Sequence, residues 1–124
     1  MEDVLAGFSG LEGLNDANID KFVAGGSIGV YVLDKAQPGP FKVYYVGRSD
    51  TDVAKRLKTW VADGGYGYFK FRYMASAKAA YELECKIYHA LSPTDNDIHP
   101  DAPNGTSYTC PVSGCVNAQK MRRW

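Results

Sequence analysis

Two tyrosines in the first half of the chain have neighbours that suit a polar site. Tyr31 follows Gly29 in one apolar run, and Tyr45 precedes Gly47 in the next. Side chains two residues apart on a strand share a face, and a glycine there leaves room for another group to approach. Strand tyrosines are common, so this pair alone is a weak signal.

A glutamate interrupts an apolar helical stripe further along the chain. At about 100° per residue, Glu84 lies in the middle of a stripe, whereas Glu82 points the opposite way. The apolar members of that stripe are Ala77, Ala80, Tyr81, Ile87, Tyr88 and Leu91. A carboxylate in such surroundings is costly unless it is paired or binds a cation. We therefore expect Glu84 to be functional, or else ion-paired with a neighbouring arginine.

An arginine stands at the border of another amphipathic segment. Arg56 lies beside the apolar side of this segment, which is formed by Val53, Leu57 and Trp60, and Lys55 points away from it. A guanidinium can present two parallel donors to a phosphate. Arginines that only cover apolar surface are also frequent.

Periodicity and turn signals predict the elements that must position these residues. We expect three strands, over residues 27–33, 42–47 and 68–73. We expect helices near residues 17–23, over 53–61 and from 77 to about 91. The order predicts a small α+β domain with a three-stranded antiparallel sheet flanked by helices.

The remaining segments are predicted to be less regular. Residues 1–27 form a lead with one short helix, 28–91 form the core, and 92–124 form an irregular tail packed on the core. The prolines and glycine of residues 35–40 predict a turn between the first two strands. The chain of 124 residues has room for one domain.

The charges balance overall but are unevenly distributed. The chain has 14 basic and 14 acidic residues; residues 1–34 hold six acids and one base, and residues 35–90 hold ten bases and five acids. A basic middle is compatible with a phosphate-binding face, and chance segregation of surface charge explains it about equally well. No apolar run approaches the roughly 20 residues of a membrane span, and we expect no secretory signal. A soluble, cytoplasmic protein is therefore expected.

Three cysteines are too few and odd in number for a disulfide framework. Cys110 and Cys115 are separated by four residues, at the limit of common zinc-ligand spacing. His99 lies upstream, and Cys85 and His89 are one helical turn apart. We expect buried or free thiols at Cys110 and Cys115 rather than a zinc site.

Several short motifs resemble those of the GIY-YIG nuclease superfamily. Gly29-Val30-Tyr31, followed after thirteen residues by Tyr45-Val46-Gly47, is similar to its paired signature. Lys55-Arg56-Leu57 and the run from Ala79 to Glu84 fall where that superfamily keeps an arginine and a metal-binding glutamate. The resemblance covers Ile28 to Leu91, and Asn96 is a counterpart of a downstream asparagine.

The resemblance implies a metal-dependent endonuclease that hydrolyses DNA phosphodiester bonds. Tyr31 would help to activate the attacking water, with Tyr45 as its partner in shaping the site. Arg56 would hold the scissile phosphate, and Glu84 would bind one divalent cation, Mg²⁺ or Mn²⁺. Tyrosine is a poor base at neutral pH, so this role requires its pKa to be lowered.

The expected contacts to the substrate come from Gly29, Gly47, Arg48 and Asn96. One departure from the superfamily is Trp60, which stands where some relatives have histidine and cannot transfer a proton. Two alternatives remain open. One is a nucleic-acid-binding module of the same fold without catalysis. The other is a protein-interaction or zinc-stabilised domain in which Glu84 pairs with Arg56. The oligomeric state is not predicted.

Overall fold

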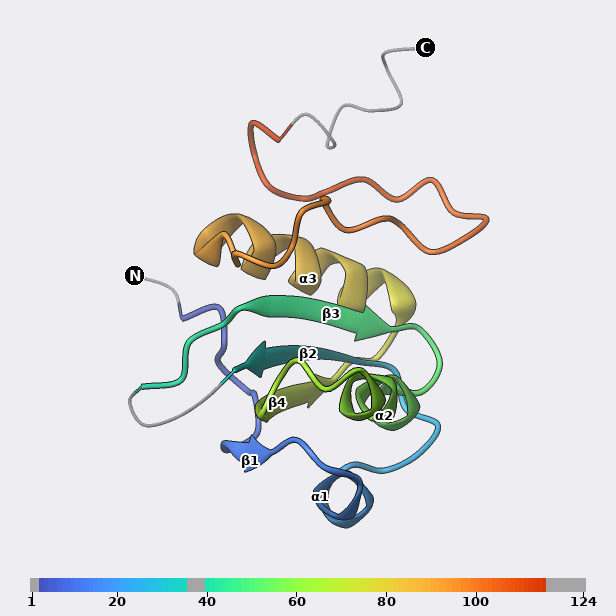
Figure 1. Ribbon diagram of the computed structural model, residues 1–124. Coiled ribbons are helices and arrows are strands. Elements are labelled where there is room, and N and C mark those ends of the chain that lie inside the picture. The colour runs from blue at the N-terminus through green and yellow to red at the C-terminus, as the bar shows by residue number, and fades with distance from the viewer. Residues whose placement is uncertain (1–2, 36–39, 116–124) are drawn as a thin grey trace.

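The computed structural model describes residues 3–35 and 40–115, and Figure 1 shows the path of the chain. Four strands and three helices form within these residues. In chain order they are β1 (Glu12–Gly13), α1 (Asp16–Phe22), β2 (Gly29–Asp34), β3 (Tyr45–Ser49), α2 (Val53–Asp63), β4 (Tyr68–Tyr73) and α3 (Ala77–Leu91). The predicted α+β class is confirmed.

The described strands form a single antiparallel sheet in the order β1-β4-β2-β3. The prediction of three strands was wrong by one, because Glu12 and Gly13 pair with Phe69 and Tyr68 of β4. A two-residue strand is too short to show the alternation by which a strand is recognised in a sequence. The central strand β2 is buried along its whole length, and β3 lies at an edge.

The helix boundaries follow the capping residues that the sequence offers. Asp52 accepts a hydrogen bond from the Lys55 backbone N–H at 3.1 Å, and α2 ends at Gly64, which has a left-handed φ of 82°. Ser76 accepts one from Ala79 N–H at 3.1 Å and begins α3. The predicted helix over 77–91 is confirmed, and α2 extends two residues beyond the predicted end.

The hairpin strands begin later than predicted. The second strand was expected from residue 42, but the Lys42 N–H donates to the Asp34 carboxylate at 3.0 Å rather than to the strand backbone. The backbone therefore enters the regular ladder only at Tyr45. Val43 precedes the strand and packs on the α3 face of the sheet, whereas Tyr45 packs on the α2 face. Most of the predicted turn, residues 36–39, lies outside the described residues.

The sheet lies between α3 on one face and α1 and α2 on the other (Figure 1), and each interface holds an apolar cluster. On one face, α1 and α2 pack over residues that include Tyr31, Leu33 and Phe69. On the other, α3 packs over Val30, Val32 and Val46. Alternate residues of β2 thus serve opposite cores, which the period-two geometry of a strand requires.

The segment after α3 is irregular, as predicted, and runs back over the outer side of that helix (Figure 1). Asp95 N–H donates to the Tyr44 carbonyl at 2.9 Å. The Asn96 amide makes two hydrogen bonds to the backbone of Val46, at 2.8 and 3.0 Å. These bonds cover the edge of β3, an edge that would otherwise expose unpaired backbone groups. Within the described residues, no helix has the length and apolar character needed to cross a membrane.

Candidate functional site

A cavity of about 460 Å³ lies beside the edge strand β3. Its wall includes the four side chains singled out from the sequence, Tyr31, Tyr45, Arg56 and Glu84. Gly47, Arg48 and Asp50 and residues 96 and 98–104 complete it. Each of the four comes from a different helix or strand, so the fold alone brings them together.

The four residues do not all lie on one side of the sheet. Tyr31 and Tyr45 belong to the core between the sheet and α2, whereas Glu84 projects from α3 on the opposite face. They meet because β3 is the last strand, so groups from both faces reach around its edge.

Gly47 makes the approach of the two tyrosines possible. It pairs directly with Tyr31 across the β2–β3 ladder. A Cβ atom at this position would lie 2.5 Å from Tyr31 Cζ and 3.0 Å from Tyr45 Cε2, closer than carbon atoms approach without a bond. The Tyr31 ring occupies the space that a side chain would fill, and its centroid is 6.4 Å from that of Tyr45.

The Tyr31 hydroxyl is anchored by Trp60. The indole Nε1 donates a hydrogen bond to Tyr31 Oη at 2.6 Å. Burial raises the pKa of Tyr31 strongly, and the Trp60 hydrogen bond and the charge of Arg56 offset this only in part. Burial also raises the pKa of Tyr45. The lowered tyrosine pKa that a catalytic base requires is therefore not supplied by the residues that the structure describes.

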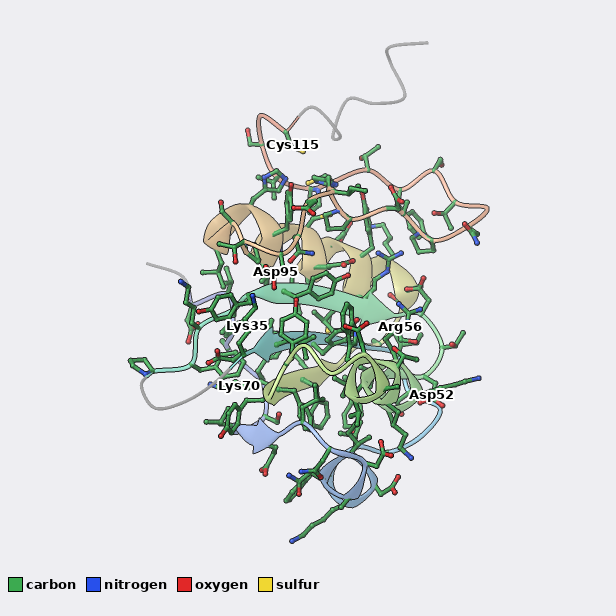
Figure 2. The ribbon with its side chains drawn as sticks, viewed as in Figure 1. Lys35, Asp52, Arg56, Lys70, Asp95 and Cys115 are labelled. Atoms are coloured by element: carbon green, nitrogen blue, oxygen red, sulfur yellow. The ribbon has the colours of Figure 1, made fainter. Side chains whose placement is uncertain are left out.

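Arg56 is the exposed cation of the site. It lies in the first turn of α2, and no described residue holds its guanidinium in a hydrogen bond or ion pair. Its positive charge nevertheless favours the ionised forms of Tyr31, Tyr45 and Glu84. Figure 2 shows Arg56 beside β3 on the side of α2. Such a guanidinium is available to an anion that enters the cavity.

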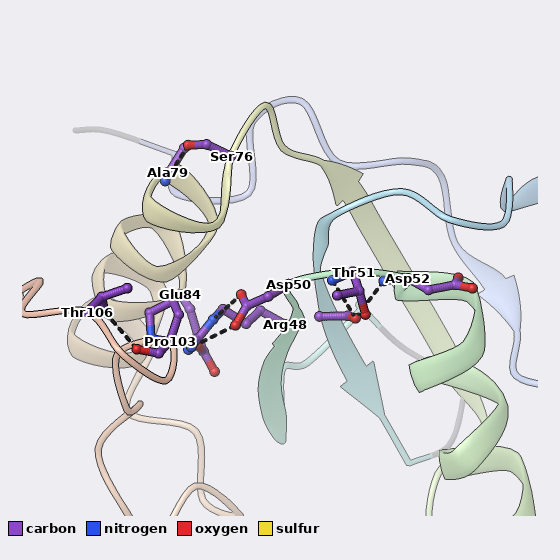
Figure 3. Close-up of polar contacts among 10 residues, drawn as sticks. Arg48, Asp50, Thr51, Asp52, Ser76, Ala79, Glu84, Pro103 and Thr106 are labelled. Atoms are coloured by element: carbon purple, nitrogen blue, oxygen red, sulfur yellow. Dashed lines mark hydrogen bonds and ion pairs between the residues drawn. The ribbon is translucent and has the colours of Figure 1, made fainter.

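Glu84 has an arginine partner, but this partner is Arg48 and not Arg56. Arg48 Nη1 lies 2.6 Å from Glu84 Oε1, and Arg48 Nε lies 2.8 Å from Asp50 Oδ1 (Figure 3). The Arg48 guanidinium also lies over the Tyr81 ring, 5.3 Å from its centroid. Burial raises the pKa of Glu84 to about 7, and the hydrogen bond from Arg48 opposes this shift. The carboxyl group is thus close to half-ionised at neutral pH.

The second oxygen of Glu84 remains available to a ligand. Only Oε1 takes part in the ion pair with Arg48, and the described residues contain no fully buried side-chain oxygen or nitrogen that lacks a partner. Oε2 is therefore not closed off by the protein at the cavity that Glu84 lines. It is a hard oxygen donor of the kind that Mg²⁺ and Mn²⁺ prefer. Asp50 lies on the same wall, but Arg48 holds both of its carboxylate oxygens, at 2.8 and 3.3 Å. Glu84 thus offers one oxygen that fits such an ion.

The predicted substrate contacts are only partly at the cavity. Gly47 and Arg48 line it, but Gly29 does not. A Cβ at Gly29 would lie 2.9 Å from the Arg72 carbonyl oxygen, so this glycine permits close packing and does not face the site. Asn96 lines the cavity, yet its amide is already bonded to the backbone of Val46. These bonds indicate that Asn96 fixes the tail segment of the cavity wall to β3.

Sequence reasoning missed Asp50 and the tail residues of this wall, and the role of Trp60 behind it. Asp50 was not singled out as a site residue, although its position two residues after Arg48 permits the observed ion pair. Trp60 was noted for its inability to transfer a proton, whereas its indole N–H binds the Tyr31 hydroxyl. Residues 98–104 come from the irregular tail, where no periodicity indicates direction.

The cysteines form a separate cluster on the far side of α3. Cys85, Cys110 and Cys115 are all buried thiols, as expected for two of them. Figure 2 shows Cys115 in the tail, away from the sheet. Cys110 and Cys115 gather with His89 and His99, an arrangement that the sequence did not predict.

Comparisons of the chain with protein-family models, with curated proteins and with solved structures found no match.

Proposed function

We propose that this protein is a metal-dependent endonuclease of the GIY-YIG type that hydrolyses DNA phosphodiester bonds. The observation that carries the proposal is that Tyr31, Tyr45, Arg56 and Glu84 line one cavity beside β3. They come from four elements spread over 54 positions of the sequence, and the motif resemblance names the same four.

In this proposal Arg56 binds the scissile phosphate. Its guanidinium is exposed and has no protein partner among the described residues, so binding an anion breaks no existing ion pair. Two parallel N–H donors match the oxygens of a phosphodiester. Additional negative charge develops on these oxygens in the transition state, and a fixed cation there lowers the barrier.

Glu84 would hold the divalent ion. When bound, Mg²⁺ or Mn²⁺ supplies Lewis-acid stabilisation of a phosphate oxygen. The ion pair with Arg48 fixes the Glu84 carboxylate through Oε1 and leaves Oε2 directed to the cavity. Arg48 thereby positions a ligand, and this role replaces the direct phosphate contact expected from the sequence.

Tyr31 would orient the attacking water as a neutral phenol. Its oxygen accepts the Trp60 N–H, which leaves its own O–H proton available to a group in the cavity. Because burial raises its pKa, the hydroxyl keeps its proton at neutral pH. Tyr45, half-buried on the neighbouring strand, would form the adjacent wall and limit the approach of water.

The direct test is cleavage of supercoiled plasmid and branched DNA with Mg²⁺ or Mn²⁺ by the wild-type chain, Glu84→Gln and Arg56→Ala. We expect both variants to lose at least about 10²-fold in rate. Equal cleavage by all three proteins would assign the activity to a contaminant. Lys55→Ala is the matched control, because Lys55 is the exposed neighbour of Arg56 outside the cavity wall.

The Arg48–Glu84 ion pair favours a second candidate, a nucleic-acid-binding module of the same fold without catalysis. An already paired carboxylate has less need of a cation. This candidate predicts salt-dependent DNA binding that Glu84→Gln leaves unchanged, with no product in any metal. The endonuclease proposal predicts product that requires both the metal and Glu84.

A further inference from the structure

A second group of ligating atoms lies between α3 and the tail. The side chains are those of His89, His99, Cys110 and Cys115, and their ligand atoms all lie within 4.8 Å of one another. Both cysteines are buried and both histidines are half-buried. His89 comes from α3, while the other three come from the tail that crosses it.

Two distances within this group match the edges of a tetrahedral metal site. His89 Nε2 lies 3.2 Å from His99 Nε2, and Cys115 Sγ lies 3.5 Å from the same His99 atom. With Zn–N near 2.0 Å and Zn–S near 2.3 Å, the edges of a tetrahedral zinc site are about 3.3 Å for N···N and about 3.5 Å for N···S. The ligand atoms of all four side chains lie within 4.8 Å of one another, so a small closing movement would bring them around one ion.

The hydrogen bonds of His99 present the correct nitrogen to such an ion. His99 Nδ1 lies 2.8 Å from the Pro100 carbonyl oxygen, which can only accept, so Nδ1 carries the proton. In the neutral ring, Nε2 then has one lone pair, yet both His89 and Cys115 approach it. One lone pair cannot serve two donors well, whereas a metal would satisfy all of these atoms. Histidine ligands in proteins commonly donate their other ring N–H to such a backbone carbonyl.

The surroundings of the thiols support the same arrangement. Tyr81, Cys85, Cys110 and Cys115 form one buried cluster, and the Cys85 thiol hydrogen-bonds to that of Cys110. A metal ion bound here would take the place of the thiol protons of Cys110 and Cys115.

We propose that His89, His99, Cys110 and Cys115 bind one structural Zn²⁺ that fastens the tail to α3. Two thiolates and two imidazoles in a tetrahedral set favour zinc over Mg²⁺ or Ca²⁺, which prefer oxygen. All four positions are filled by protein atoms, which is typical of structural rather than catalytic zinc.

This zinc site would also hold one wall of the cavity beside β3. His99 belongs to both regions, and residues 100–104 of the wall lie between it and Cys110. Asn96 fixes the same segment to β3 at its other end. The wall is thus attached at both ends. The zinc proposal stands on its own geometry and holds whether or not the cavity cleaves DNA.

The test uses the full chain, purified under reducing conditions, stripped with a chelator and titrated with Zn²⁺ or Co²⁺. We expect one equivalent of either metal, with the intense visible bands of tetrahedral Co²⁺ and a thiolate charge-transfer band. Cys110→Ser should lose at least about 90% of the bound metal. Cys85→Ser, which removes a neighbouring buried thiol outside the ligand set, should keep it. Glu84→Gln should also keep it, which separates this site from the proposed Mg²⁺ site.

A second measurement covers the case in which Cys110→Ser does not fold. In the wild-type chain, Zn²⁺ should protect two of the three thiols from alkylation, and a chelator should abolish that protection. Less than about 0.1 equivalent of metal bound by the titrated wild-type chain would overturn the proposal. Equal retention of Zn²⁺ by folded Cys110→Ser and Cys85→Ser would do so as well.

Discussion

The cavity beside β3 and the His/Cys cluster outside α3 adjoin each other at His99, but they are constructed differently. The cavity takes its four key side chains from β2, β3, α2 and α3 and encloses about 460 Å³. The cluster takes three of its four side chains from the irregular tail, and its ligand atoms lie within 4.8 Å of one another. One region is an open cavity, whereas the other is a close group of ligand atoms.

The two regions differ in which polar atoms lack a protein partner. In the cavity, Arg56 has no partner among the described residues and Glu84 directs one oxygen to the open space. In the cluster, every ligating atom faces another ligating atom. Polar groups without a protein partner suit a site that binds and releases substrate. A complete set of four protein ligands suits a permanent structural ion. The predictions below test this distinction.

The largest effect is expected at Arg56. Arg56→Ala should reduce DNA cleavage by about 10²- to 10³-fold, because it removes the cation placed where charge develops. The side chain is exposed and unpaired among the described residues, so the melting temperature should stay within about 1 °C. Plasmid nicking rates and a thermal melt measure both quantities. Lys55→Ala is the control. If Lys55→Ala slowed cleavage as much as Arg56→Ala does, the effect could not be assigned to the cavity.

The next largest effect concerns the pH dependence of metal binding at Glu84. The carboxyl pKa is raised from 4.5 to about 7, chiefly by burial. Below pH 7 a proton occupies the carboxylate and competes with the cation, so Mn²⁺ affinity should fall about tenfold between pH 8 and pH 6. Electron paramagnetic resonance of Mn²⁺ with the zinc-loaded protein measures this. Arg48, Asp50 and Arg56 are the charged groups that act on this carboxyl group. Glu84→Gln removes the carboxyl group itself and should show weak binding with a flat profile.

The same shift has a consequence for stability. A raised pKa in the folded state means that protonated Glu84 stabilises the fold at low pH. This contribution is complete below pH 4.5 and is lost as pH rises through about 7. Glu84→Gln should lack this component, and urea unfolding at pH 5 and pH 8 compares the two proteins. A larger loss with rising pH in the variant than in the wild type would contradict the assignment.

A smaller effect is expected for substitution of Gly47, which leaves space for the Tyr31 and Tyr45 rings. Gly47→Ala should lower the free energy of unfolding by about 1–3 kcal/mol, because the new Cβ overlaps the buried Tyr31 ring. Chemical denaturation measures the change. Gly65→Ala is the matched control, since its Cβ would meet only the Asp63 carboxylate at 3.6 Å. If both variants were equally stable, the close packing of Gly47 against Tyr31 would be refuted.

The smallest effect is expected for the hydrogen bond behind Tyr31. Trp60→Phe removes the indole donor, which is worth about 0.5–1.5 kcal/mol, and should slow cleavage by about 2- to 12-fold. Because this bond lowers the pKa of Tyr31, its loss should also move any alkaline limb of the rate profile to higher pH. A pH–rate profile separates this effect from simple loss of packing. An unchanged rate in a folded variant would show that the hydrogen bond from Trp60 to Tyr31 has no part in the reaction.

Much of the core could be predicted because it depends on local patterns. The helix over 77–91, the strand over 68–73 and the caps at Asp52 and Ser76 follow from short-range periodicity and from side-chain oxygens next to free backbone N–H groups. The two-residue strand β1 and the late start of β3 depend on pairing and on the Asp34 hydrogen bond, which leave no local pattern.

The candidate site divides in the same way. The sequence by itself selected Tyr31, Tyr45, Arg56 and Glu84, because residue type, position on an element and motif spacing are local properties. Only the tertiary structure decided that Glu84 reaches them around the edge of β3, that its partner is Arg48, and that Trp60 holds Tyr31. It also decided that three tail residues join His89. Distances between segments far apart in the chain depend on how the elements pack, and the periodicity of one segment contains no information about the position of another.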